Sequence, residues 1–194
     1  MGIFFSSHRQ PVFTVKLDRG DNAGFYSFGY IDTTVTSNAI TYTPVNKCVL
    51  VCFAHKPNVT NCRHSSQGFW QVDSASYSLN GKTVERSGNT AILDTGTTLA
   101  LVDDTILSQI YGAIQGATFD QSQGGWKYPE NATVPTVEFA VGDTLYTVNS
   151  QDFAFGPADS GFLFGGIQSR GDLTFDILGN VFLFGGTAEK TYAP

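Results

Sequence analysis

The chain has 194 residues, of which 41% are hydrophobic and 14% charged, and its formal net charge is −6. This length can bury one sizeable core, and the acidic balance argues against nucleic acid or an anionic membrane surface as a partner. No apolar run approaches the about 20 residues that a membrane-spanning helix needs, and 21 glycines with 16 phenylalanines are typical of an all-β chain with many turns.

Short strands are predicted through the first half of the chain. Residues 12–17 alternate apolar and polar side chains, which is the period of a half-buried strand. A turn rich in glycine, asparagine and aspartate follows, and residues 25–31 are expected to pair back as a hairpin. Asn80-Gly81 is a strong two-residue hairpin turn. Further strands are predicted at residues 41–45, 69–72, 77–79, 83–86 and 89–93.

One amphipathic helix is predicted at residues 104–115, with Asp103 as its N-cap and Gly116 as its stop. Its apolar side chains recur at three- and four-residue spacing, so we interpret this stripe as core. After it, a hairpin is expected around Gly142-Asp143, and two late strands are expected at residues 161–165 and 173–177. The stripe comprises Ile106, Leu107, Ile110, Tyr111 and Ile114.

The motif with the clearest chemistry lies at residues 91–100, which read Ala-Ile-Leu-Asp-Thr-Gly-Thr-Thr-Leu-Ala. An apolar strand ends at Asp94, a tight turn follows, and the chain becomes apolar again. Aspartic peptidases present each of their two catalytic carboxylates in this way, because two carboxylates that share one proton can act as base and acid on a water molecule. Gly96 permits the sharp turn, and the hydroxyls of Thr95 and Thr97 can fix the carboxylate by hydrogen bonds.

Competing interpretations of this motif were weighed. A bare Asp-Thr-Gly triplet is a common turn sequence, and its apolar flanks are what make it specific. A second triplet, Asp159-Ser160-Gly161, follows the turn-like Gly156-Pro157-Ala158 and lacks those flanks, so we interpret it as a surface loop. No glycine-rich Walker loop occurs in the chain.

With this motif and several others in matching order, the chain resembles the C-terminal lobe of the fungal pepsin-like aspartic proteases. The resemblance implies one all-β lobe of the pepsin-like fold over residues 11–183, with one or two short helices. Residues 1–10 would be a remnant of the segment between lobes, and 184–194 a divergent tail without the last pair of strands. The matching segments are residues 11–15, 24–32, 40–42, 67–70, 91–98, 164–168 and 177–179.

The resemblance implies an aspartic endopeptidase that needs no cofactor or metal and acts on peptide or protein substrates. Asp94 would be one catalytic carboxylate, Thr95, Gly96, Thr97 and Thr98 would shape its loop, and Gly179 would pack beneath that loop. The second aspartate would come from an N-terminal lobe or from a second copy of the chain, so we expect little or no activity from this chain alone.

Members of this family are extracellular or vacuolar. The opening run of this chain, Met1 to Phe5, is too short for a signal peptide. A localisation outside the cytosol is therefore an expectation from the family, and this chain shows no signal peptide of its own.

Residues 47–64 interrupt the resemblance, and removing them restores an uninterrupted strand, turn and strand. Their coding length is on the scale of a short fungal intron, so we interpret them as a non-family insertion derived from a retained intron. The same segment holds all three cysteines and two histidines, which would be candidate zinc ligands, but their spacing lacks a zinc-knuckle pattern. These residues are Cys48, Cys52, His55, Cys62 and His64.

The main alternative function is a non-catalytic one, either a truncated gene product or a peptide-binding β module. A sugar-binding β-sandwich also fits the composition, but it explains none of the motifs.

Overall fold

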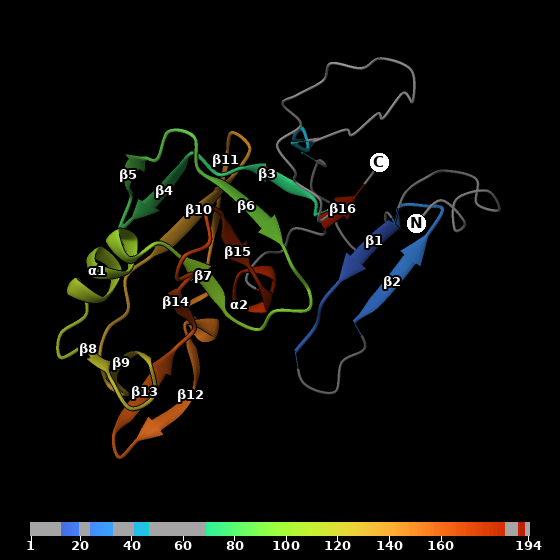
Figure 1. Cartoon of the computed structure of the whole chain (residues 1–194). Coiled ribbons are helices and arrows are strands. Elements are labelled where there is room, and N and C mark those ends of the chain that lie inside the picture. Colours follow the sequence, from blue (N-terminus) through green and yellow to red (C-terminus); the bar gives the residue numbers. More distant parts are fainter. Residues whose placement is uncertain (1–12, 20–23, 33–40, 47–68, 185–189, 193–194) are drawn as a thin grey trace, which may run out of the picture.

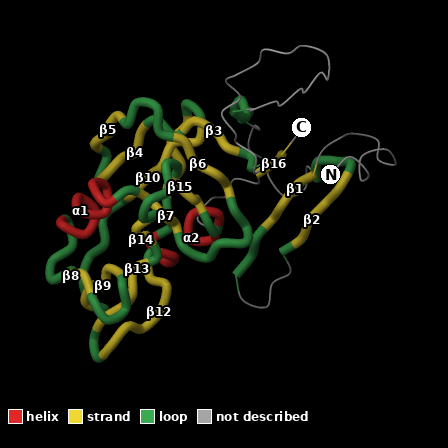
Figure 2. Tube along the Cα trace, in the orientation of Figure 1, coloured by secondary structure: helices red, strands yellow, loops and turns green. Residues whose placement is uncertain are grey.

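The computed structural model describes residues 13–19, 24–32, 41–46, 69–184 and 190–192. Within these residues sixteen short strands form four sheets, and two short α-helices accompany them (Figures 1 and 2). The predicted all-β lobe with one or two short helices is therefore confirmed. The predictions for residues 1–10 and 47–64, including the five cysteine and histidine residues, lie outside the described residues.

The central sheet has five strands in the order β14-β7-β15-β6-β3. Strand β15 lies between its neighbours, parallel to β6 and antiparallel to β7. Because parallel strands end at the same edge of a sheet, the residues that follow β6 and β15 are neighbours there. The bounds are Gln71–Asp73 for β3, Thr90–Leu93 for β6, Ala100–Val102 for β7, Ile167–Ser169 for β14 and Asp176–Leu178 for β15.

A second sheet has the order β11-β10-β4-β5 and contains two hairpins. Asn80 and Gly81 have φ angles of 51° and 79°, which is the left-handed backbone that a two-residue hairpin turn requires. The predicted turn is thus confirmed, and so is the hairpin around Gly142. The bounds are Ser76–Leu79 for β4, Lys82–Glu85 for β5, Val137–Val141 for β10 and Thr144–Thr147 for β11.

A third sheet has the order β12-β13-β9-β8, and it corrects one prediction. Gly156-Pro157-Ala158, expected to be a turn, lies inside β12. Proline is tolerated there because β12 is an edge strand and its pairing with β13 contains register shifts. The bounds are Thr118–Asp120 for β8, Gly125–Pro129 for β9, Ala154–Asp159 for β12 and Phe162–Gly165 for β13.

The fourth sheet joins the two ends of the chain in the order β16-β1-β2. Strand β1 (Phe13–Lys16) pairs antiparallel with both β2 (Phe25–Phe28) and β16 (Lys190–Tyr192). The prediction that no strand follows residue 183 is therefore wrong. An edge strand offers unpaired N–H and C=O groups to any extended segment that reaches it, whatever its sequence.

Helix α1 (Asp104–Gly112) supplies much of the hydrophobic core. Asp103 caps it as predicted, accepting hydrogen bonds from the amides of Thr105 and Ile106 at 3.0 and 3.2 Å. The helix ends before the predicted residue 115, and a tighter turn leads to Gly116, whose φ is +80°. The predicted core stripe is confirmed, since Ile106, Leu107, Ile110, Tyr111 and Ile114 are all at most 3% exposed.

Two further helical segments follow the hairpins. One turn of 3₁₀-helix, η1, spans Ser150–Asp152, and the second α-helix, α2, spans Asn180–Leu183 directly after β15. Three successive residues of α2, Val181, Phe182 and Leu183, are buried in the core. In the described part of the chain, no helix is long and apolar enough to cross a membrane.

Candidate active site

Asp94 directly follows the last residue of β6, and its carboxylate is held by its own loop. The amide of Gly96 donates to Oδ1 at 2.9 Å, and the Thr97 hydroxyl donates to Oδ2 at 2.6 Å. Each carboxylate oxygen thus accepts a hydrogen bond from a fixed donor, and these bonds orient the group. A Cβ added at Gly96 would lie only 3.2 Å from Oδ1, so the turn fits a glycine closely.

The strand β15 and the start of α2 support this loop from beneath. The Asp94 amide donates to the Leu178 carbonyl at 3.1 Å, while the amides of Asn180 and Val181 donate to the carbonyls of Thr97 and Thr98 at 2.8 and 2.9 Å. These bonds join the loop to the end of β15 at three points.

Gly179 lies where the loop and this support are closest. A Cβ at this position would be 2.3 Å from the carbonyl oxygens of both Thr97 and Leu99, well inside van der Waals contact. Any other residue would force these backbone segments apart. The site therefore requires glycine for close approach, since its φ of −84° is open to any residue.

The structure brings together all six site residues that the sequence suggested: Asp94, Thr95, Gly96, Thr97, Thr98 and Gly179. Asp94 is half-buried, however, where a buried carboxylate was expected. Gly96 and Thr98 are exposed, so one side of the loop faces outward. One contact was not anticipated: the Tyr26 hydroxyl of β2 donates to the Thr95 hydroxyl at 3.4 Å.

The second triplet lies in a different sheet from Asp94. Asp159 ends β12, and Ser160 and Gly161 form the turn into β13. Its side chain is 49% exposed and pairs with Lys127 at 2.6 Å, and Lys127 also pairs with Asp120 at 2.7 Å. This carboxylate is therefore part of a surface ion cluster.

Among the described residues, no group of three or more histidine, cysteine, aspartate or glutamate side chains is arranged to hold a metal ion.

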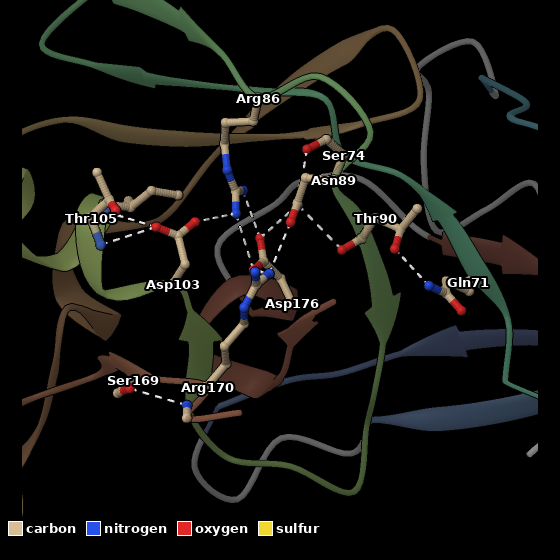
Figure 3. Close-up of polar contacts among 12 residues, drawn as sticks. Gln71, Ser74, Arg86, Asn89, Thr90, Asp103, Thr105, Ser169, Arg170 and Asp176 are labelled. Atoms are coloured by element: carbon tan, nitrogen blue, oxygen red, sulfur yellow. Dashed lines mark hydrogen bonds and ion pairs between the residues drawn. The ribbon is translucent and has the colours of Figure 1, made fainter. Parts of the chain in front are cut away.

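Sequence reasoning missed a buried ion cluster beside the central sheet (Figure 3), which we call the Asp176 cluster. It consists of Arg86, Asn89, Asp103, Arg170 and Asp176. The Asp176 side chain is fully buried, and the two arginine side chains are only 8% and 15% exposed. Two cations and two carboxylates balance in charge, as buried ions require.

Asp176, the first residue of β15, accepts every hydrogen bond at the centre of this cluster. Arg86 donates to both of its oxygens, at 2.6 and 3.1 Å, and Arg170 donates to one at 2.6 Å. Asn89 donates to the other oxygen at 3.1 Å. A signal was available in the sequence, since a charged residue within an apolar strand needs a buried partner. The partners themselves are 90 and 6 residues away and could not be identified from spacing.

Asp103 connects the cluster to α1, because it also accepts from Arg86 at 2.7 Å. Partial burial by itself would raise the pKa of this carboxyl. The hydrogen bond from the Ile106 amide and the charge of Arg86 outweigh burial, and the pKa of Asp103 is lowered.

Comparison with known protein families gives a match over almost the whole chain. The model of the eukaryotic aspartyl protease family matches residues 6–185. The match includes the Asp94 loop and its supporting strand.

Individual relatives are fungal proteins. The chain is 37% identical over 178 residues to aspergillopepsin-1 of Aspergillus pseudoglaucus, 38% identical over 178 residues to penicillopepsin-1 of Talaromyces stipitatus, and 35% identical over 176 residues to endothiapepsin of Cryphonectria parasitica. These alignments cover 92%, 92% and 89% of this chain but only 40%, 41% and 37% of the relatives. The chain thus spans about two fifths of the length of the curated relatives that it matches.

Proposed function

Because this chain belongs to the eukaryotic aspartyl protease family, we propose that it is the C-terminal lobe of an aspartic endopeptidase and that Asp94 is one of its two catalytic carboxylates. The observation that carries the proposal is the fixed orientation of the Asp94 carboxylate. Gly96 and Thr97 donate to its two oxygens, and the loop rests on Leu178 and Gly179.

In the proposed reaction Asp94 acts with a second carboxylate on a water molecule. One carboxylate, unprotonated, takes a proton from the water, whose oxygen attacks the carbonyl carbon of the peptide bond. The other, protonated, donates a hydrogen bond to the carbonyl oxygen as negative charge develops there. Thr97 and Gly96 would keep Asp94 in the required orientation, and no cofactor takes part.

The second carboxylate must come from outside the described loop. We propose an N-terminal lobe as its source, because the chain corresponds to only about two fifths of its relatives. A second copy of this chain, with two Asp94 loops facing each other, is the alternative. Peptide or protein substrates would bind between the two halves, and the proposed localisation is extracellular or vacuolar.

Reconstitution of the enzyme tests this proposal. The chain is combined with the N-terminal lobe of a fungal relative, and peptide hydrolysis is measured in acidic buffer with and without pepstatin. We expect pepstatin-sensitive hydrolysis that Asp94→Asn reduces at least about 100-fold. Asp159→Asn is the matched control, because it changes an aspartate of the same triplet type that lies in a surface turn, and it should retain activity.

Three other outcomes are informative. Activity that survives Asp94→Asn would refute the catalytic role. Hydrolysis by the chain alone, rising with the square of its concentration, would favour the second copy as partner. Peptide binding without hydrolysis in the reconstituted protein would favour the peptide-binding β module.

A further inference from the structure

We propose that the Asp176 cluster sets the register of β15 and thereby positions the Asp94 loop. Arg86, Arg170 and Asp176 are thus positioning residues for the catalytic carboxylate, an inference that rests on the function proposed above. In Figure 3 the two arginines approach Asp176 from opposite sides, and they come from segments that follow β5 and β14. One short strand is in this way tied to two separate parts of the fold.

The pairing of β15 by itself specifies register weakly. Only three residues pair with β6, Asp176 with Ala91, Ile177 with Ile92 and Leu178 with Leu93. Side chains alternate between the two faces of a strand, so a shift by one residue would move Asp176 to the opposite face. Apolar side chains could exchange places at moderate cost, but a carboxylate that left its two arginines would leave three charges buried without partners.

The register of β15 in turn decides what lies beneath the Asp94 loop. Gly179 occupies the one position where a Cβ would be 2.3 Å from two carbonyl oxygens. A shift by one residue would bring Leu178 or Asn180 to this position, and neither could be accommodated. The same shift would remove the bonds from the Asp94 amide to Leu178 and from the Asn180 amide to Thr97.

The distances along the chain are short enough for direct mechanical coupling. Asp176 is two residues from Leu178 and three from Gly179, and the intervening backbone is extended and paired on both sides. An extended strand paired on both sides moves as a unit, so anchoring its first residue anchors its last. The cluster acts on Asp94 through β15, without contact with the reacting atoms.

Amide hydrogen exchange of the full chain, followed by NMR, tests the proposal without any need for activity. The reporting amides are those of Asp94, Asn180 and Val181, and the reference is the Val148 amide, which donates to Val137 in another sheet at 2.8 Å. In Arg170→Lys we expect exchange at the three reporters to rise on the order of 10-fold more than at the reference. Asp176→Asn should have a larger selective effect.

Lys127→Gln provides the matched control, because it also removes a cation that pairs with two carboxylates, Asp120 and Asp159, but in another sheet. It should leave the three reporters and the reference in the same ratio as in the parent chain. A rise that is equal at reporters and reference in Arg170→Lys, or no rise at all, would overturn the proposal. If Asp176→Asn does not fold, Arg170→Lys alone decides.

This outcome is independent of catalysis. Selective exchange with no hydrolysis in the reconstituted protein would retain the positioning role and remove the protease function. Hydrolysis without selective exchange would do the reverse.

Discussion

The amide nitrogen of Asp94 lies 3.1 Å from the carbonyl oxygen of Leu178, and this hydrogen bond joins the end of β6 to the end of the parallel strand β15. It makes the candidate carboxylate part of the central sheet's edge. The position of Asp94 therefore depends on residues more than 80 positions later in the chain, and several predictions test that dependence.

Gly179→Ala should destabilise the fold by about 1–3 kcal/mol, the range for inserting a methyl group into a closely packed site. Its Cβ would meet the carbonyl oxygens of Thr97 and Leu99 at 2.3 Å. Urea unfolding measures the change. Gly112→Ala is the control, because a Cβ there would meet nothing within 4 Å, and it should leave stability unchanged or raise it. Equal stability of both variants would contradict the close approach at Gly179.

Two substitutions at Asp103 should separate its roles as helix cap and as ion partner. Asp103→Ala removes both the acceptor for the Thr105 and Ile106 amides and the partner of Arg86, and should cost about 1–2 kcal/mol or more. Asp103→Asn keeps a good N-cap side chain and removes only the charge, so it should cost less. Thermal or urea unfolding of the pair measures both values. A greater loss in Asp103→Asn would mean that the ion pair, and not the cap, stabilises this position.

Stability should decrease in acid, below about pH 4, which is the usual range of an unfolded carboxyl. Hydrogen bonds from Lys127, Ser122 and Gln123 lower the pKa of Asp120 in the fold, and the pKa of Asp103 is also lowered. As pH falls, the unfolded chain takes up protons before the folded chain does, so the stabilisation is full above this range and is lost through the folded-state pKa.

Unfolding measured at several pH values between 7 and 2 checks this dependence. Asp120→Asn removes one of the responsible carboxyls, so its stability should fall less steeply with acid than that of the parent chain. A steeper fall would contradict the sign of the shift.

The sequon at Asn131 should carry a glycan if the chain enters a secretory pathway as its family suggests. Asn131 is exposed in the turn after β9, and Ala132 and Thr133 complete the acceptor sequence. Expression in a secreting fungal host, followed by mass spectrometry with and without an endoglycosidase, measures occupancy. Asn131→Gln should remove this mass difference at that peptide. Secreted material with Asn131 unmodified would show that the turn is not accepted.

Local features of this fold could be predicted from the sequence because short-range chemistry governs them. The Asn80-Gly81 turn, the Asp103 cap and the apolar stripe of α1 each depend on neighbours within a few residues. The end of a strand at Asp94 belongs to the same class. Gly156-Pro157 misled the prediction, since the position of β12 at a sheet edge removes the usual penalty for proline in a strand.

The sequence by itself determined the all-β class, the family and the residues of the Asp94 loop, because residue type and spacing along the chain encode turns, caps and motifs. Tertiary structure alone decided that β16 pairs with β1, that β15 runs between β6 and β7, and that Arg86 and Arg170 meet at Asp176. These contacts join residues up to about 180 positions apart, and their partners are chosen by burial and sheet register, which no local pattern records.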